Sequence, residues 1–418
     1  MSVSRRQFTH FLALAGSAAV APLRLDWLQS PLQGDGEPFW ARVRDEFVMP
    51  PDLAMFNAAN LCPSSRRVID TLTRHTREVD LDPSPANRAK LGPAREASRA
   101  LIAAHLRVTP EEIVITRNTS EANNLVSSGL SLKAGDEVLI FADNHPSNHA
   151  AWRDKATRAG FTVRILEQPS PHPGPDYYVE AVTKAITPQT RLLSMTHVTS
   201  TVGDVLPVAE MCRVSRERNV LTLVDGAQSF GVLDVDLSRI QPDFYSGSAH
   251  KWPCGPRENG VLYVRQAVQE RLSPTVISLY GGAVGVSRRL EANGQRDEAA
   301  MIAFGEAIAL QKEVGPARIE ARVRALSRAL ADGLRKIDGV KVWTSPESER
   351  SANIVSFQPA ALDIRRLNTA LYEKDRIVCA TRGDTNRGGL RFSPHFYNSM
   401  KEIDRTIEAI GRYVKTGV

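Results

Sequence analysis

The chain has 418 residues, of which 42% are hydrophobic and 24% are charged, and its formal net charge is +6. This length and composition indicate a globular protein of two packed domains and exclude the low-hydrophobicity composition of disordered chains. The positive charges occur singly or in pairs rather than in blocks, so we expect no nucleic-acid partner.

Residues 1–21 have the features of an export signal. Arg5 and Arg6 are followed by an apolar run from Phe11 to Val20. This pattern resembles a twin-arginine signal, and the alternative is an amphipathic helix with a chance arginine pair. The pattern is compatible with cleavage among the small residues at the end of the run. It is equally compatible with an uncleaved segment that serves as an anchor. The run is shorter than the roughly 20 apolar residues of a transmembrane helix. We therefore expect a periplasmic or exported protein that is not stably inserted in the membrane after processing.

From about residue 100 to 265, short runs rich in β-branched residues alternate with stretches of helical length. We expect strands at residues 113–116, 137–141, 162–166, 191–196, 221–224 and 261–264. Helices are expected between them, near residues 120–128, 148–158, 177–186 and 208–218. This alternation predicts an α/β fold with a mainly parallel central sheet flanked by helices, whose ligand-binding residues follow the strand ends.

The pattern changes after residue 296. A long helical pattern covers residues 299–337, with a break expected at Gly315-Pro316. Short strands are expected near residues 340–343, 353–357 and 377–380, and a final helix over 400–414. We therefore expect a large domain over residues 37–295 and a smaller α+β domain over residues 296–418.

The strongest chemical signal is an aspartate at the end of one predicted strand and a lysine after the next. Asp225 ends the strand that begins at Leu221, and Lys251 precedes Trp252. A carboxylate can hold a pyridine nitrogen protonated, and a lysine amine can form an imine with an aldehyde. The pair suits a pyridoxal 5'-phosphate (PLP) site, although an isolated lysine is more often a surface residue.

The two motifs together resemble a known family. Asp-Gly-Ala-Gln at 225–228 and Ser-Ala-His-Lys at 248–251 are similar to motifs of the class V aminotransferases of PLP fold-type I. This group includes cysteine desulfurases and isopenicillin-N epimerase-like proteins. The resemblance extends from about Met55 to Ile410, and it implies a PLP Schiff base on Lys251 in a homodimer.

The same resemblance implies further contacts with the cofactor. They are Thr119, Ser120, His145, Ser200, Asp225, Gln228, Ser248, His250 and Gln295. Thr119 and Ser120 follow a strand and open a helix, where hydroxyl and backbone N–H groups suit a phosphate, and either residue could also cap the helix. His145, rather than His149, matches the residue that stacks on the pyridine ring. Gln295 lies in a region that reaches the partner subunit's site in the family.

The substrate contacts come from both ends of the chain. Arg391 resembles the family's arginine that binds the substrate carboxylate, a bidentate task that suits guanidinium. Arg382 could take a second carboxylate. Asn60 either approaches the substrate or serves a turn.

The motifs leave the reaction open among several types. Desulfuration needs a thiol on a mobile loop, but residues 381–389 contain no cysteine and Cys379 falls in a predicted strand. The pattern therefore favours an aminotransferase or epimerase that acts on an amino acid, a peptide or a secreted metabolite. The alternatives are a C–S lyase or desulfurase, and a protein that retains PLP without turnover. A dinucleotide-binding enzyme is disfavoured because no G-x-G-x-x-G follows the first strands.

The cysteines give no sign of a metal site. They are widely separated in the sequence and form no metal-binding motif: Cys62, Cys212, Cys254 and Cys379. We expect no bound metal. Buried free thiols are the more natural interpretation of these cysteines, and whether any of them pair stays open.

Overall fold

The computed structural model describes residues 34, 36–359, 361–383 and 386–418. The expected export signal at residues 1–21 lies outside these ranges. Within them, no helix combines the length and the apolar character that a membrane crossing requires.

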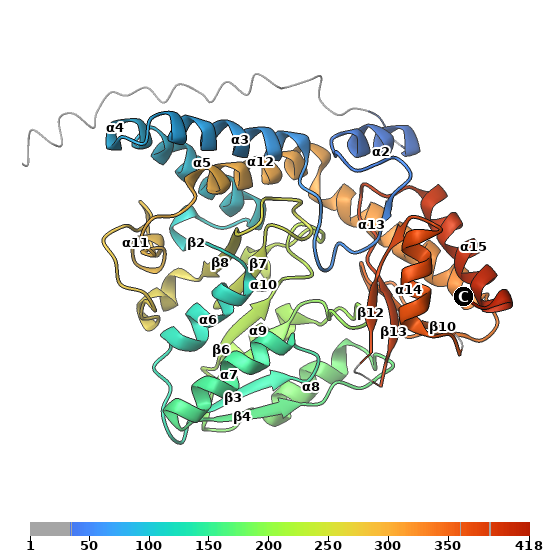
Figure 1. Ribbon diagram of the computed structural model, residues 1–418. Helices are drawn as coiled ribbons and strands as arrows, with labels where there is room; N and C mark the ends of the chain where they lie inside the picture. The colour runs from blue at the N-terminus through green and yellow to red at the C-terminus, as the bar shows by residue number, and fades with distance from the viewer. Residues whose placement is uncertain (1–33, 35, 360, 384–385) are drawn as a thin grey trace, which may run out of the picture.

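The large domain is built on a seven-stranded sheet (Figure 1). Its strands are β2 (Ile113–Thr116), β3 (Glu137–Phe141), β4 (Thr162–Leu166), β5 (Thr190–Thr196), β6 (Leu221–Asp225), β7 (Phe244–Ser248) and β8 (Gly260–Val264). Their order is β2-β8-β7-β6-β5-β3-β4. Only β8 runs antiparallel to its neighbours in this sheet. The predicted mainly parallel sheet is therefore confirmed.

Apolar side chains are buried on both faces of this sheet. Along β3, Val138 and Ile140 belong to one core, and Leu139 and Phe141 to another. This double burial is typical of a parallel sheet covered by helices on both sides. The helices are α2 (Gly36–Asp45), α3 (Arg66–Leu81), α4 (Pro85–Arg88), α5 (Leu91–Leu106), α6 (Thr119–Gly129), α7 (Pro146–Ala159), α8 (Pro175–Ala185), α9 (Val208–Glu217), α10 (Leu237–Ile240), α11 (Ser287–Leu290) and α12 (Glu298–Val314).

The layer formed by α3, α5 and α12 leads into the connection between the domains (Figure 1). After α12 the chain breaks at Gly315, whose φ is +98°, and α13 (Pro316–Arg335) begins with proline, as predicted. Ile319 belongs to the large core, whereas Leu330 belongs to the small one. The core therefore changes within α13, later in the chain than the boundary expected near residue 296.

The smaller domain contains a four-stranded sheet in the order β12-β13-β10-β9. Its elements are β9 (Val340–Val342), β10 (Val355–Pro359), α14 (Ile364–Glu373), β12 (Ala380–Arg382), β13 (Gly389–Phe392) and α15 (Met400–Thr416). The N-terminal segment joins it, because β1 (Ala54–Met55) pairs in parallel with β11 (Ile377–Val378). The predicted α+β character of this domain is confirmed.

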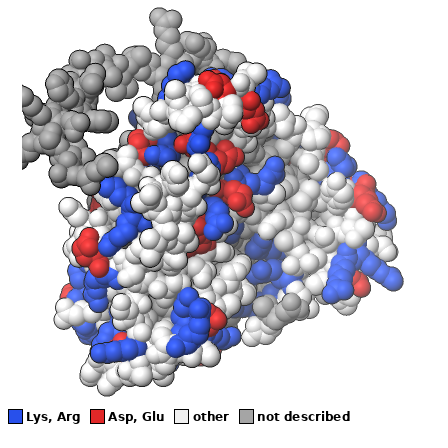
Figure 2. All heavy atoms as spheres, turned by 60° about the vertical axis from the view of Figure 1, so that its left-hand side comes forward, with Lys and Arg blue, Asp and Glu red and all other residues white. Residues whose placement is uncertain are grey.

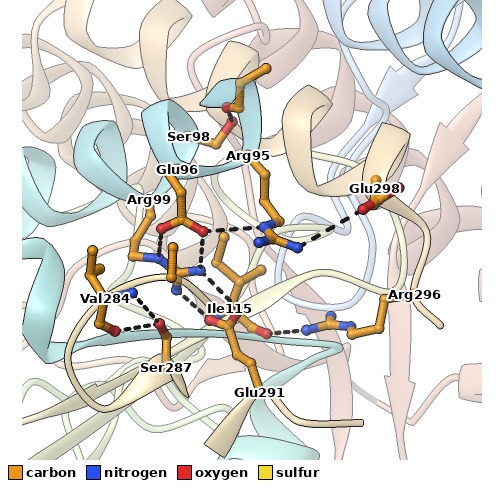
Figure 3. Close-up of polar contacts among 12 residues, drawn as sticks. Arg95, Glu96, Ser98, Arg99, Ile115, Val284, Ser287, Glu291, Arg296 and Glu298 are labelled. Carbon is orange, nitrogen blue, oxygen red and sulfur yellow. Dashed lines mark hydrogen bonds and ion pairs between the residues drawn. The ribbon is translucent and has the colours of Figure 1, made fainter. Parts of the chain in front are cut away.

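A buried ion pair fixes the segment before α12 against the sheet (Figure 3). Arg99 on α5 donates from both terminal nitrogens to Glu291, with 2.9 Å between Nη2 and Oε2. Glu291 also accepts a hydrogen bond from the backbone N–H of Ile115, and Arg296 donates to the Ile115 carbonyl. Since β2 ends at Thr116, shortly before α6 begins at Thr119, this network holds the strand that leads to the expected phosphate site.

Charged side chains of both signs are interspersed over the face of the molecule drawn in Figure 2. The surface of the protein also carries local i,i+4 pairs that are exposed: Arg158–Asp154, Lys184–Glu180 and Arg213–Glu217. Such surface pairs contribute little to stability.

Candidate active site

The fold brings most of the predicted residues to one edge of the central sheet. Thr119 follows β2, His145 follows β3, Asp225 ends β6 and Lys251 follows β7. These four strands run in the same direction, so their carboxyl ends meet at that edge. Burial lowers the pKa of His145, and the charge of Lys251 acts in the same direction, so the two side chains lie near each other.

Lys251 has the electrostatics of a nucleophilic amine. Burial lowers its pKa to about 8, the positive charge of Arg391 acts in the same direction, and the carboxylate of Asp225 opposes both. The unprotonated share of this amine is therefore larger at neutral pH than for an exposed lysine, and it reaches half near pH 8. An unprotonated amine can attack an aldehyde carbon.

Asp225 is held in a fixed orientation. Its side chain is buried, with 3% exposed, and both carboxylate oxygens accept hydrogen bonds. Asn123 Nδ2 donates to Oδ2 at 2.9 Å, and the Ala227 N–H donates to Oδ1 at 3.0 Å. Ser246 fixes Asn123 in turn by donating to its Oδ1 at 2.7 Å. This arrangement preserves a carboxylate that can face a pyridine nitrogen.

The start of α6 gathers groups that suit an anion. Asn118 caps the helix by accepting from the Glu121 N–H at 3.0 Å, so neither Thr119 nor Ser120 is needed as the cap. The hydroxyls of Thr119 and Ser248 lie 2.7 Å apart, and the Thr119 N–H donates to Ser248 Oγ at 2.9 Å. Ser120 is exposed beside them. Hydroxyls gathered at a helix N-terminus suit a phosphate.

Gln228 anchors the turn that carries Lys251. Its Nε2 donates to the Ala59 carbonyl at 3.0 Å, and its Oε1 accepts from Trp252 Nε1 at 2.9 Å. The tryptophan beside Lys251 is thereby fixed to the turn that follows β6. His250 precedes the lysine, and burial together with the charge of Lys251 lowers its pKa to about 4, so its imidazole is neutral at pH 7.

The two predicted histidines after β3 have different surroundings. His145 is exposed, and its Nδ1 accepts from the Ser147 N–H at 3.2 Å at the start of α7. His149 is buried, and its Nε2 pairs with the Ala142 carbonyl at 3.2 Å. Only His145 therefore presents a ring face that a planar group can cover.

Arg391 lies buried between the two domains, with 6% exposed. It donates to the Ser200 carbonyl at 3.0 Å and to Asn57 Oδ1 at 3.4 Å. Burial and the nearby charge of Arg382 lower its pKa to about 10. Ser200 thus acts through its backbone, and Asn57 rather than the exposed Asn60 supplies the side-chain contact.

Gln295 lies apart from this group. Its Oε1 accepts from Arg88 at 2.6 Å, and it lines a surface pocket together with Leu279 and Tyr280. Within the described part of the chain, no hydrogen bond or ion pair joins Gln295 to Lys251 or its neighbours.

The comparisons with known proteins follow the same lines. The model of the family "Aminotransferase class-V" matches residues 83–406. This chain belongs to the class V aminotransferase family. Isopenicillin N epimerase from Streptomyces clavuligerus is 32% identical to it, over 89% of this chain and 97% of the relative. A cysteine desulfurase from Haloferax volcanii is 28% identical, over 76% of this chain and 80% of the relative.

Solved structures of similar fold include a C-S lyase and a cysteine desulfurase. A mutant of the C-S lyase C-DES, with glycine covalently linked to its PLP cofactor, superposes with a TM-score of 0.80 at 25% identity, over 88% of this chain and 98% of that one. The cysteine desulfurase of Thermococcus onnurineus gives a TM-score of 0.80 at 24% identity, over 90% and 98% of the two chains. The predicted PLP fold-type I architecture is confirmed.

The residues of this class V chain fit the cofactor that the sequence predicted, and PLP is confirmed at the level of the family. The amine of Lys251 with its lowered pKa, the fixed carboxylate of Asp225 and the paired hydroxyls of Thr119 and Ser248 match its aldehyde, ring nitrogen and phosphate. When bound, PLP supplies an electron sink for bonds at a substrate's α-carbon.

Sequence reasoning missed a cluster of two thiols and one imidazole next to this site. The Sγ atoms of Cys62 and Cys254 and a ring nitrogen of His395 lie within 4.8 Å of one another, and all three residues are buried. The Cys62 N–H donates to the His250 carbonyl at 2.8 Å, and the Cys254 N–H donates to the Lys251 carbonyl at 2.9 Å. Burial raises the pKa of Cys254, so its thiol is protonated. The two backbone hydrogen bonds join this cluster to the turn that carries Lys251.

Proposed function

We propose that this class V chain uses PLP bound at Lys251 to act at the α-carbon of an amino compound, as an aminotransferase or epimerase. The observation that carries the proposal is the lowered pKa of Lys251 in a site that also holds Asp225 and Arg391. Arg391 would bind the α-carboxylate of the substrate, and Lys251 would exchange a proton with the α-carbon. An amine with a pKa near 8 can both accept and return that proton close to neutral pH.

A desulfurase is the less favoured alternative. Cys379 is the cysteine next to the loop where a sulfur-accepting thiol is expected. Its thiol contacts Asn368 Oδ1 at 3.2 Å, and burial raises its pKa. A protonated, packed thiol is a poor nucleophile.

The reaction is tested by supplying purified holoenzyme with a panel of L- and D-amino acids in D2O. Mass spectrometry and chiral chromatography then report the products. Deuterium at the α-carbon with inversion of configuration supports an epimerase, and a keto acid supports an aminotransferase. Release of sulfur from cysteine would support the desulfurase instead. A spectral change without any product would indicate a PLP-retaining binding protein and overturn the proposal.

We also propose a homodimer, supported by an exposed apolar segment before α11. Ile277 and Leu279 are 90% and 99% exposed, and Tyr280 beside them is 64% exposed. Contiguous apolar surface of this kind marks interaction sites. Since Leu279 and Tyr280 share a pocket with Gln295, a second copy of the chain that covers this segment would bring Gln295 to the interface.

We further propose that the protein is exported through the twin-arginine route, on the strength of Arg5, Arg6 and the apolar run that follows. Cell fractionation tests this proposal. The wild-type chain is expected in the periplasm, and replacement of both arginines by lysine is expected to retain it in the cytoplasm. Equal distribution of both forms would contradict the proposal.

A further inference from the structure

Two arginines lie on one face of the small sheet, and the strand register explains why. β12 pairs antiparallel with β13, so that Ala380 lies opposite Arg391 and Arg382 lies opposite Gly389. Leu390 and Phe392 point into the small core, so the alternation of side chains turns Arg391 to the other face. Arg382 is the diagonal neighbour of Arg391 on that same face.

Both arginines lie near His145, as does the reactive lysine. Burial lowers the pKa of His145, and the charges of Lys251, Arg382 and Arg391 act in the same direction. Each arginine also loses basicity through burial, and the charge of Arg382 lowers the pKa of Arg391. Two like charges are thus held close together in a poorly solvated place, which is unfavourable without a compensating anion.

The described part of the chain supplies no such anion to either group. Arg391 contacts a carbonyl and an amide oxygen, both uncharged, and its Nε has no partner there. Arg382 forms no ion pair among the described residues, and its buried Nε also lacks a partner. The acid that acts on Arg382 is Asp143, but Asp143 is already paired with Arg387 at 2.5 Å.

The backbone also excludes a partner across the strand from Arg382. Gly389, directly opposite, has a φ of +134°, and a Cβ there would lie 2.0 Å from the Phe357 carbonyl oxygen. A side chain at this position is therefore strained and sterically blocked, so no acidic residue can stand opposite Arg382 without moving the sheet.

We propose that the substrate of this site carries two carboxylates, with Arg391 binding the carboxylate at the α-carbon and Arg382 binding a second one. This inference rests on the proposed function and assigns its substrate class. A guanidinium binds a carboxylate through two parallel charge-assisted hydrogen bonds, and the Nε–H that each arginine leaves without a partner is one donor of such a pair. The second carboxylate belongs either to the side chain of a dicarboxylic amino acid or to a group attached through that side chain.

The first test measures binding without chemistry. Glutarate and butyrate differ by one carboxylate and carry no amino group, so neither reacts at the cofactor. Calorimetry on the PLP-loaded wild-type protein is expected to give roughly ten- to hundredfold tighter binding of glutarate, as a charged hydrogen-bonded pair provides. Equal affinity for the two compounds would overturn the inference.

The second test assigns the effect to Arg382. Arg382→Gln is expected to remove the preference for glutarate and to leave butyrate binding unchanged, and Arg382→Lys is expected to retain part of the preference. Arg366→Gln is the matched control, because Arg366 is an exposed arginine on α14 of the same domain. An equal loss of affinity for both compounds in Arg382→Gln would make Arg382 a structural residue and overturn its assignment.

The third test identifies the source of the second carboxylate. Glutamate, 2-aminoadipate and γ-glutamylglycine place it at increasing distances from the α-carbon, and norvaline lacks it. KM is expected to be lowest for one of the three dicarboxylates and to rise selectively for them in Arg382→Gln. A lowest KM for norvaline would contradict the inference. Tight glutarate binding with no reaction on any amino compound would instead contradict the proposed function alone.

Discussion

Asn123 donates a hydrogen bond from Nδ2 to the buried carboxylate of Asp225 at 2.9 Å, and it is itself held by Ser246. Asn123 lies on α6, the helix that begins at Thr119. The helix α6 therefore serves the site twice. Its first residue, Thr119, lies at the expected phosphate site, and Asn123, one turn later, orients the carboxylate of Asp225.

Replacing the carboxylate tests this arrangement. In Asp225→Asn the ring nitrogen of the cofactor loses its negatively charged partner, so we expect kcat to fall by on the order of 100-fold or more. Steady-state kinetics on the PLP-saturated variant measure the effect. Asn123→Ala keeps the carboxylate but frees it to rotate, and we expect a smaller fall in kcat together with a shifted absorption band. Wild-type kcat in Asp225→Asn would contradict the role assigned to it.

The lowered pKa of Lys251 predicts how cofactor attachment depends on pH. The folded protein holds the pKa at about 8 instead of 10.5, so the unprotonated fraction grows as pH rises towards 8 and changes little well above it. After removal of the cofactor, the rate of PLP attachment should rise with pH, with its inflection near 8, and level off well above that pH. Because Asp225 raises this pKa, Asp225→Asn should move the inflection to lower pH. An inflection near 10.5 would show that the amine is not buried as described.

The ion pair between Arg99 and Glu291 predicts a large effect on stability. Glu291→Gln removes the buried charge that compensates Arg99 and leaves Glu96 as its remaining acidic partner. We expect the free energy of unfolding to fall by about 3 kcal/mol. The matched control is Glu270→Gln, whose carboxylate is exposed in its pair with Arg289 and for which we expect less than about 1 kcal/mol. Urea denaturation followed by circular dichroism measures both, and similar losses would refute the distinction.

The exposed segment before α11 predicts a change of assembly. Leu279→Glu places a charge in the proposed interface, and we expect sedimentation to show monomers where the wild type forms dimers. Leu81→Glu is the control, since Leu81 is 86% exposed at the end of α3. Dissociation by both variants, or by neither, would argue against an interface at this segment.

The sheet could be predicted from the sequence because its strands are short, apolar and separated by helices. The bounds of β3 and β4 agree with the prediction, and the break between α12 and α13 follows from Gly315-Pro316. The domain boundary was harder to place, since α12 is apolar around much of its circumference and packs in the large core. Nothing local in the sequence tells which core such a helix joins.

The candidate site shows the same limit. Asp225 and Lys251 could be found from the sequence because each lies in a short motif of adjacent residues. Asn57 meets Arg391, and Cys62 meets Cys254, only through long-range folding. Asn123 left a local signal, since it lies one turn after Thr119 on the helix that opens at the phosphate turn.

The most direct test is to reduce the PLP-loaded protein with borohydride, digest it and locate the cofactor by mass spectrometry. We predict that the peptide containing Lys251 carries the added pyridoxyl mass, and that Lys251→Ala carries it nowhere. Label on another lysine, or a wild-type protein that binds no PLP, would contradict the account.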